Sequence, residues 1–173
     1  MNVVSDLEAR VGNPLSVTLI GPGVYGSHLA YQIEETPGVE LSILADIERR
    51  KAERTFRNAG VPDEEVAIEE SADGIASALA ADQRVATSDG ELAAGAPVDV
   101  VIETTGDAQA AAVHAWEAID AGNDVVMVSV EVDATIGPLL ARLADQRGVT
   151  YSMAYGDEPA QVVELCDWAR TQG

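Results

Sequence analysis

A glycine-rich segment at residues 17–30 constrains the fold of this chain more than any other feature. An apolar, largely β-branched run leads into Gly21-x-Gly23-x-x-Gly26, and a helical pattern follows at once. The order strand, glycines, helix is typical of the turn that opens a dinucleotide-binding βαβ unit. In such a turn Gly21 permits a sharp exit from the strand, Gly23 lets the backbone approach a pyrophosphate, and Gly26 lets the helix lie close to the sheet.

The helix after this turn is expected to begin near Val24 and to bind the pyrophosphate with its first turn. The free backbone N–H groups at Val24, Tyr25 and Gly26 and the positive end of the helix dipole favour an anion. The fingerprint also requires an acidic residue about 20 residues later, at the end of the second strand. The alternating segment 39–46 ends in Asp46, whose carboxylate would accept a hydrogen bond from the ribose 2′-hydroxyl and repel a 2′-phosphate. The alternative is a glycine-rich turn that binds nothing.

The segment after Asp46 is helical and basic, and it bears on the choice between NAD and NADP. It holds five of the chain's ten basic residues: Arg49, Arg50, Lys51, Arg54 and Arg57. Arg49 and Arg50 lie just beyond the acid, where a cation could accommodate the 2′-phosphate of NADP. Asp46 favours NAD, so we expect NAD rather than NADP, while the arginines leave NADP open. For Arg54 and Arg57 we expect ion pairs with neighbouring acids on a solvated helix face.

Strands and helices alternate from residue 17 onward. Strands are expected at 17–20, 39–46, 84–87, 98–103, 124–130 and 148–153, and helices at 24–35, 49–57, 71–82, 88–95, 108–121, 135–147 and from 159 onward. A short helix at residues 1–13 precedes them. Nearly continuous apolar strands are typical of parallel sheets buried on both faces. We therefore predict one domain, residues 1–173, with the α/β Rossmann fold: a doubly wound parallel sheet of about six strands with helices on both faces.

A second candidate region comes directly after the apolar strand that precedes Thr104. Thr104, Thr105 and Gly106 follow that strand, and doubly wound sheets bind ligands outside the carboxyl ends of their strands. We therefore expect these residues beside the cofactor; an ordinary βα turn capped by a polar residue is the alternative. Glu131 and Asp133 follow the next strand at the same edge, and they are the candidates for polarising or orienting a substrate.

Two side chains with reactive groups are expected to be structural. His114, on the helix at 108–121, is interpreted as a surface or core histidine rather than a catalytic one. Cys166, the only cysteine, lies among apolar residues at helical spacing and is expected to be a buried filler. A single cysteine excludes a disulfide framework and agrees with a reducing compartment. No metal-ligand spacing is present.

The charge of the chain limits its partners. Thirty acidic residues and ten basic ones give a net charge of −20, spread along the whole sequence. Such a surface repels nucleic acid and anionic lipid, so neither is an expected partner. Without a membrane-spanning hydrophobic run or a signal sequence, the chain is expected to be soluble and cytoplasmic. The charge pattern resembles that of halophilic proteins, in which molar salt screens self-repulsion, and predicts a fold that loosens in dilute buffer.

Four segments together resemble a known family. They are GPGVYG at 21–26, ETTGDAQAAAVHAWEAIDAG at 103–122, VVMVSVEVDATIGPLLARLADQRGV at 125–149 and YSMAYGDEPAQVVELCDWAR at 151–170. The chain resembles the N-terminal domain of homoserine dehydrogenase-like oxidoreductases. It is most similar to the branch with a C-terminal SAF domain, which includes deoxyxylulose-phosphate reductoisomerase-like enzymes. The resemblance implies an NAD(P)-dependent hydride transfer between nicotinamide and a small hydroxy or carbonyl substrate.

The resemblance also assigns roles to residues. It implies that the pyrophosphate is held by the three glycines and the adenosine ribose by Asp46, and that the nicotinamide end is flanked by Thr104, Thr105, Gly106 and Glu131. Homoserine dehydrogenases proper carry an Asn-Lys pair after the strand at 124–130, where this chain has Val130-Glu131. Homoserine is therefore not the expected substrate.

The chain stops at Gly173, whereas its relatives continue into a substrate-binding and dimerisation domain. An excised domain, a truncated gene product and one subunit of a split enzyme all remain open, as do a homodimer and a separate partner subunit carrying the substrate domain. The alternative to an oxidoreductase domain is a stand-alone module that binds NAD(H) in a regulatory or structural role without turnover.

Overall fold

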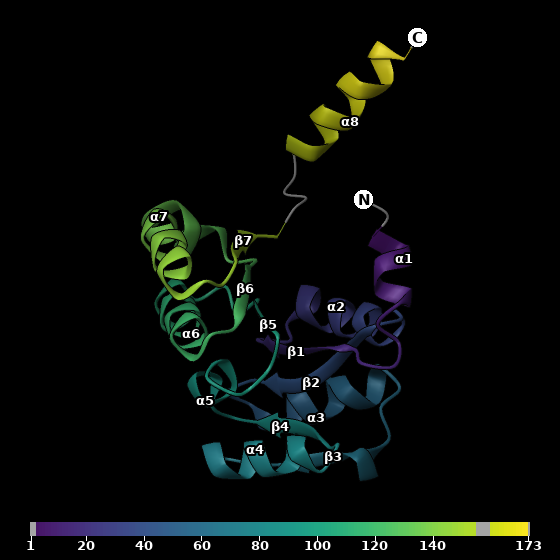
Figure 1. Ribbon diagram of the computed structural model, residues 1–173, viewed down its shortest axis with the longest axis vertical. Coiled ribbons are helices and arrows are strands. Elements are labelled where there is room, and N and C mark those ends of the chain that lie inside the picture. Colours follow the sequence, from purple (N-terminus) through teal and green to yellow (C-terminus); the bar gives the residue numbers. More distant parts are fainter. Residues whose placement is uncertain (1–2, 155–159, 173) are drawn as a thin grey trace.

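The computed structural model describes residues 3–154 and 160–172 and contains one parallel sheet with helices on both faces (Figure 1). The strand order is β3-β4-β2-β1-β5-β6-β7. The strands are β1 (Leu15–Ile20), β2 (Val39–Ala45), β3 (Val66–Ile68), β4 (Arg84–Thr87), β5 (Val100–Glu103), β6 (Asp124–Met127) and β7 (Tyr151–Met153). The α-helices are α1 (Val3–Glu8), α2 (Val24–Glu34), α3 (Arg49–Asn58), α4 (Ala72–Ala80), α5 (Gly90–Ala94), α6 (Ala108–Ala121), α7 (Val130–Arg147) and α8 (Ala160–Thr171). This is the doubly wound fold that the alternation of elements predicts.

The sheet is buried between two apolar layers. Helices α2 and α3 cover one face, where Val17 and Leu19 of β1 pack, and helices α4 to α7 cover the other, where Ile20 packs. Successive residues of β1 therefore point into different cores, as expected for a strand with period-two side chains. Both faces need apolar side chains, which is why these strands read as continuous hydrophobic runs.

Strand β1 lies at the point where the strand order reverses. It pairs with β2 on one side and with β5 on the other, so the chain builds one half of the sheet before crossing to the other half. The carboxyl ends of β1, β2, β4 and β5 all meet at one edge because the pairs between them are parallel. That edge is where open α/β sheets bind their ligands.

The sheet agrees with the predicted doubly wound sheet of about six strands, but some element boundaries differ. It has seven strands, because the short segment β3 pairs with β4 at the sheet edge. Strand β6 ends at Met127, not at residue 130, and α7 begins at Val130 rather than at Thr135. Two acids in the first turn of α7, Glu131 and Asp133, favour a helix start there through the helix dipole.

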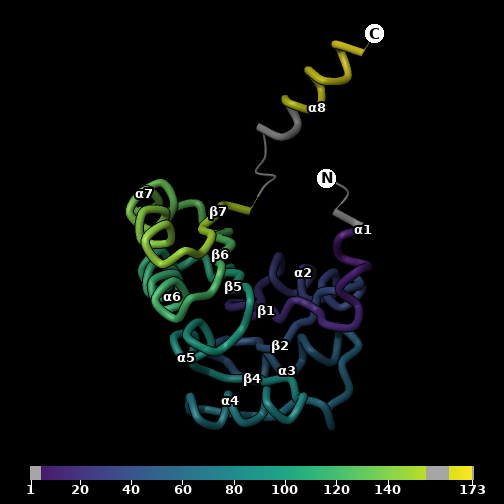
Figure 2. Tube along the Cα trace, in the orientation of Figure 1, coloured from purple at the N-terminus to yellow at the C-terminus, as the bar shows by residue number. Residues whose placement is uncertain are grey.

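Helix α8 stands clear of the sheet and the other helices (Figures 1 and 2). Cys166 on this helix is exposed, so the expectation of a buried filler is wrong: no packed layer of the described chain covers it. The start of the last helix expected at residue 159 lies outside the described residues. Among the helices of the described ranges, none is long and apolar enough to cross a membrane.

Candidate functional site

The glycine loop between β1 and α2 is shaped by contacts within the protein. Gly21 has φ +83°, and a Cβ there would lie 2.6 Å from Cα of Thr105. At Gly26 a Cβ would lie 2.7 Å from Oγ1 of Thr104. At Gly23 the nearest atom to a Cβ is the Gly21 carbonyl oxygen, 3.9 Å away. The protein's own packing thus requires glycine at the first and third positions, whereas the second faces open space.

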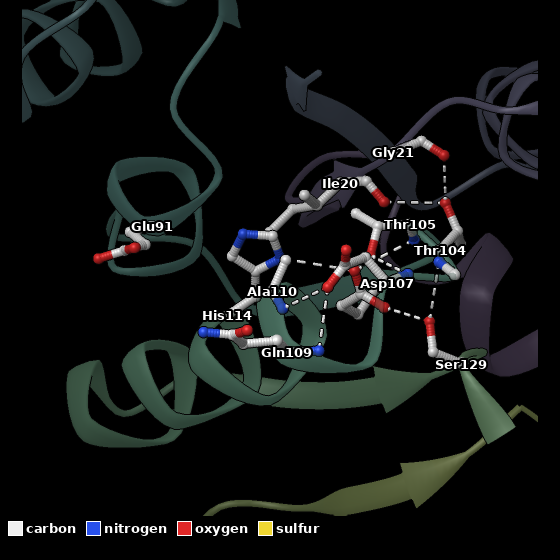
Figure 3. Close-up of polar contacts among 12 residues, drawn as sticks. Ile20, Gly21, Glu91, Thr104, Thr105, Asp107, Gln109, Ala110, His114 and Ser129 are labelled. Atoms are coloured by element: carbon white, nitrogen blue, oxygen red, sulfur yellow. Dashed lines mark hydrogen bonds and ion pairs between the residues drawn. The ribbon is translucent and has the colours of Figure 1, made fainter. Parts of the chain in front are cut away.

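Thr104 ties the end of β5 to this loop. Its hydroxyl lies 2.9 Å from the carbonyl oxygen of Ile20 and 2.7 Å from that of Gly21, and it donates to both as a shared bond (Figure 3). Its backbone N–H also donates to the Ile20 carbonyl, at 2.9 Å. One threonine therefore extends the pairing of β1 with β5 into the glycine loop.

A cavity of about 350 Å³ opens between the glycine loop and the carboxyl ends of the strands. This volume lies within the range of small-molecule and cofactor sites. The loop, the end of β2, the segment after β4 and the start of α6 each contribute to its wall, which consists of Ile20, Gly21, Gly23, Ala45, Asp46, Ile47, Lys51, Ser88, Gly90, Thr104, Thr105, Asp107, Ala110 and His114. Four separate turns thus converge on one space.

Asp46 is held firmly at this cavity. Its Oδ1 accepts a hydrogen bond from the Glu48 N–H at 2.8 Å, and its Oδ2 lies 2.7 Å from Nζ of Lys51. Only 8% of its side chain is exposed. Two carboxylate oxygens offer about four acceptor positions, so the group retains capacity to accept from a ribose diol.

Three of the four arginines of α3 are paired with carboxylates. Arg49 lies 3.1 Å from Glu53 and 3.3 Å from Glu70, and these hydrogen bonds raise its pKa. Arg49 is not part of the cavity wall. The ion pairs expected for the other two are confirmed: Arg54 with Glu48 at 3.6 Å and Arg57 with Asp63 at 2.8 Å.

Glu70 connects Arg49 to the segment after β4. It accepts from the Ser88 hydroxyl at 2.7 Å, from the Ser88 N–H at 3.1 Å and from the Thr87 hydroxyl at 3.1 Å. Partial burial acts to raise the pKa of Glu70, but the hydrogen bonds from Ser88, Thr87 and Arg49 outweigh it and hold the pKa below the ordinary value of 4.5. Since Ser88 lines the cavity, Glu70 positions part of the wall.

A buried carboxylate that sequence reasoning missed lies behind the cavity. Glu103, the last residue of β5, is fully buried. It accepts from the Ser129 hydroxyl at 2.6 Å and from the Thr105 N–H at 3.1 Å, and it lies 3.4 Å from Nδ1 of His114. His114 is a core histidine, as expected, although it also reaches the cavity wall. The sequence feature that could have indicated this buried carboxylate is a single acidic residue in an otherwise apolar strand.

The remaining candidates lie outside the cavity wall. Gly106 has φ +71° and donates its N–H to the Ser129 hydroxyl at 3.2 Å. Glu131 is exposed in the first turn of α7. Asp133 accepts a hydrogen bond from the Tyr151 hydroxyl at 3.2 Å, and burial together with Asp133 raises the pKa of Tyr151.

The first turn of α2 faces solvent beside the cavity. Val24 and Tyr25 have 83% and 56% of their surfaces exposed, and Gly26 is buried against Thr104. Of the predicted cofactor residues, the cavity therefore brings together Gly21, Gly23, Asp46, Thr104 and Thr105.

Comparison with solved structures finds the same fold in oxidoreductases. GenD2 of gentamicin A biosynthesis, solved with NAD, has a TM-score of 0.58 and 23% identity, over 82% of this chain and 34% of its own. The 1-deoxy-D-xylulose 5-phosphate reductoisomerase of Zymomonas mobilis, solved with NADPH, gives 0.60 and 18%, over 82% and 39%. Homoserine dehydrogenase of S. aureus gives 0.58 and 16%, over 84% and 33%. The chain thus spans about a third of the length of these proteins.

Sequence comparison identifies the family. No curated protein matches the chain. The family model described as "Homoserine dehydrogenase, NAD binding domain" matches residues 21–154, well over half of the chain. That range starts at the first glycine of the loop and includes the whole cavity wall except Ile20. The chain therefore belongs to the homoserine dehydrogenase NAD-binding domain family and is an NAD(P)-binding Rossmann domain of oxidoreductases that resemble homoserine dehydrogenase.

Proposed function

We propose that this chain binds NAD(H) in preference to NADP(H) in the cavity at the switch point, as the cofactor half of an oxidoreductase. The observation that carries the proposal is the convergence of Gly23, Asp46, Thr104 and Thr105 on one cavity at the edge where such sheets bind ligands. Asp46 supports the choice of NAD because a carboxylate accepts from a ribose 2′-hydroxyl and repels a 2′-phosphate.

The parts of the dinucleotide are assigned by the chemistry of the wall. The open space at Gly23 and the N–H groups of Val24, Tyr25 and Gly26 would bind the pyrophosphate. Asp46 would bind the adenosine ribose. Arg49 stays a candidate for the 2′ side of that ribose, provided that it leaves Glu53 and Glu70.

We assign the nicotinamide end of the dinucleotide to the part of the sheet edge that follows β5. Thr104, Thr105 and Gly106 would flank it, and Glu131 and Asp133 would orient the substrate. Of the two acids, Glu131 is exposed, whereas Asp133 already accepts from Tyr151. The cofactor supplies the hydride, and the protein's contribution is binding, orientation and exclusion of competing reactions.

The substrate that we propose is a small hydroxy or carbonyl compound, held partly by groups beyond this chain. The solved relatives are about three times as long, which supports a further domain or a partner subunit for the substrate. Exposed apolar side chains on α7 and α8 (Leu139, Leu165 and Trp168) support a covering partner, including a second copy of the chain.

A second candidate function is an NAD(H)-binding module with a regulatory or structural role and no turnover. The observation in its favour is that the histidine of the cavity wall, His114, is 10% exposed in its side chain and lies against Glu103. A proton-transfer group needs to reach the substrate. Hydride transfer to a small carbonyl compound, measured after the rest of the enzyme is supplied, separates the two functions.

Titration calorimetry tests the cofactor proposal. The purified chain in molar KCl is titrated with NAD⁺, NADH, NADP⁺ and NADPH, and NAD(H) is expected to bind in the micromolar range. Asp46→Ala should weaken NAD⁺ binding by about tenfold or more, because a hydrogen bond to a charged group is lost. Asp145→Ala removes the same charge from the exposed surface of α7 and should leave binding unchanged. No binding of any of the four, or equal binding by wild type and Asp46→Ala, would refute the proposal.

A further inference from the structure

The ring of His114 contacts the protein interior with one nitrogen and the cavity with the other. Nδ1 lies 3.4 Å from Oε1 of Glu103, and within the described residues this is the one hydrogen bond of His114. Nε2 lies against Gly90, where a Cβ would overlap it, and both residues belong to the cavity wall. In the described part of the chain no buried side-chain nitrogen or oxygen lacks a hydrogen-bond partner. Nε2, which makes no hydrogen bond, is therefore accessible from the cavity.

Glu103 determines which ring nitrogen of His114 carries the proton. Its Oε1 accepts a hydrogen bond from the Thr105 N–H at 3.1 Å and is also the oxygen that lies next to Nδ1. Because a carboxylate only accepts hydrogen bonds, Nδ1 donates to it. In a neutral imidazole the other nitrogen is then an acceptor. The structure thus presents one hydrogen-bond acceptor, Nε2, to a ligand in the cavity.

The part of the wall around Nε2 suits a flat aromatic group. Gly90 has no side chain, and Ala110, one helical turn before His114 on α6, has only a methyl group. Ile47 belongs to the same wall and is 96% exposed. An aromatic ring that contacts this isoleucine removes apolar surface of both groups from water, which is favourable.

The position of Asp46 places this part of the wall beside the purine base of a dinucleotide. Strands β2 and β4 pair with Ala45 opposite Thr87, and the Asp46 N–H donates to the Thr87 carbonyl oxygen at 3.2 Å. Asp46, which we assign to the adenosine ribose, therefore lies close to Ser88 and Gly90 in the cavity wall. The base is joined directly to that ribose, whereas the nicotinamide is separated from it by the pyrophosphate.

Other oxygen atoms of this wall are already engaged. The Ser88 hydroxyl donates to Glu70 at 2.7 Å. Asp107 uses Oδ1 to cap the start of α6 by accepting from two backbone N–H groups. His114 therefore supplies the acceptor that lies beside Gly90 and has no partner in the described residues. The ligand group complementary to such an acceptor is an N–H donor on an aromatic ring.

We propose that His114 is a specificity-determining residue that recognises the purine base of the dinucleotide. Nε2 accepts a hydrogen bond from the exocyclic 6-amino group, so the site selects a 6-aminopurine over a 6-oxopurine. Glu103 is a positioning residue, because it maintains the tautomer in which Nε2 carries no proton. This inference rests on the proposed dinucleotide site and adds the residue that selects its base.

Calorimetric titration of the whole chain with NAD⁺ and with nicotinamide hypoxanthine dinucleotide, in molar KCl at pH 8, tests the inference. The second ligand has a 6-carbonyl group where NAD⁺ has the 6-amino group. The wild type should bind it about tenfold or more weakly, because the carbonyl oxygen and Nε2 are both acceptors. His114→Leu should weaken NAD⁺ binding by about fivefold and bring the two affinities within about threefold of each other.

Two further variants at and away from this site sharpen the test. His114→Asn keeps a side-chain donor for Glu103 but does not reach the position of Nε2, so it should lose the preference as His114→Leu does. His28→Leu removes the only other histidine, which is exposed on α2 and is not part of the cavity wall. It should change neither affinity by more than about twofold.

Variants of Glu103 test its role through the preference and not through stability alone. In Glu103→Gln the amide oxygen can accept from the Thr105 N–H and from Nδ1 while the amide nitrogen donates to the Ser129 hydroxyl oxygen. The tautomer, and with it the preference for NAD⁺, should be retained. Glu103→Leu has no acceptor for Nδ1, so both tautomers become available and the preference should fall below about threefold.

The outcomes separate the inference from the function on which it rests. Equal binding of the two dinucleotides by the wild type overturns the inference and leaves the cofactor site intact. A preference that persists in His114→Leu and His114→Asn, or an equal effect of His28→Leu, also overturns it. Failure of the wild type to bind either dinucleotide refutes both proposals. Thermal melting of each variant verifies that a changed affinity reflects the site and not an unfolded chain.

Discussion

The two halves of the sheet edge use their polar residues differently. In the half formed by β1, β2 and β4, Gly23, Asp46 and Lys51 border a cavity. In the half formed by β5, β6 and β7, Thr104 and Thr105 also border this cavity, whereas Glu103 and Asp133 lie outside its wall and are hydrogen-bonded to other parts of the protein. Polar residues at strand ends therefore divide into those that face a ligand space and those that fix loops. Position at the carboxyl end of a strand does not distinguish the two.

The largest effect on stability is expected from the substitution of Gly21, a residue whose role is to fix the loop. Gly21→Ala places a Cβ 2.6 Å from a backbone atom of Thr105 in a residue with φ +83°. Strain and overpacking together should lower the free energy of unfolding by about 4 kcal/mol, measured by denaturant titration. Gly23→Ala is the matched variant: it meets no atom closer than 3.9 Å, so stability should hold while NAD⁺ binding is lost. If Gly21→Ala were as stable as Gly23→Ala, the two glycines would not have the separate roles described here.

The next largest effect is expected at Glu103, in the half of the edge assigned to structure. Glu103→Ala leaves the Ser129 hydroxyl and the Thr105 N–H without their acceptor and should lower the free energy of unfolding by about 3 kcal/mol. Glu103→Gln keeps the shape and one acceptor oxygen, so its loss should be smaller. NAD⁺ binding by the folded fraction of Glu103→Gln should stay within about threefold of wild type. A stable Glu103→Ala with altered substrate turnover would instead place Glu103 among the catalytic groups.

The smallest effect on stability is expected from the protonation of Glu70, whose hydrogen bonds hold Ser88 in the cavity wall. Its pKa is held below 4.5 in the folded protein, so the stability that it contributes is present above the unfolded pKa and is lost as the pH falls through the folded pKa. Its side chain is 40% exposed, so solvent screening limits the contribution to roughly 0.5 kcal/mol. The denaturation midpoint of Glu70→Gln should lie below that of wild type at pH 6, and the gap should close as the pH falls through the folded pKa of Glu70. A gap between the two midpoints that stays constant as the pH is lowered from 6 through the acid range would contradict this account.

Much of the fold follows from local patterns in the sequence. The glycine turn, the acid at the end of β2 and the apolar strands each depend on neighbouring residues, so the Rossmann architecture is predictable from them. Strand β3 was missed because three residues after an acidic turn carry little periodicity, and only the pairing with β4 makes them a strand. The start of α7 was placed too late because the alternation in residues 128–132 imitates a strand, while the Ser129 hydroxyl turns away to Glu103.

The candidate site was less predictable than the fold. Glu103 and Ser129 are 26 residues apart, and nothing in the spacing indicates that they touch. The pairing of Lys51 with Asp46 spans only five residues, but the sequence offers Arg49 and Arg50 as equal candidates. Arg49 instead contacts Glu70, 21 residues away, and is not part of the cavity wall. Such choices among similar cations depend on tertiary contacts that periodicity does not report.

The amine of Lys51, which contacts Asp46, is also a site for selective chemical labelling. Lys51 is the only lysine in the chain, so the backbone amino terminus is the one other aliphatic amine. A reagent that acylates amines would add a single side-chain label, and that label would sit in the wall of the cavity that we propose for the dinucleotide. Acylation would turn the cation into a neutral amide and leave the Asp46 carboxylate without its counter-ion. The same reaction, followed by intact-mass measurement, would count the sites that a bound ligand shields.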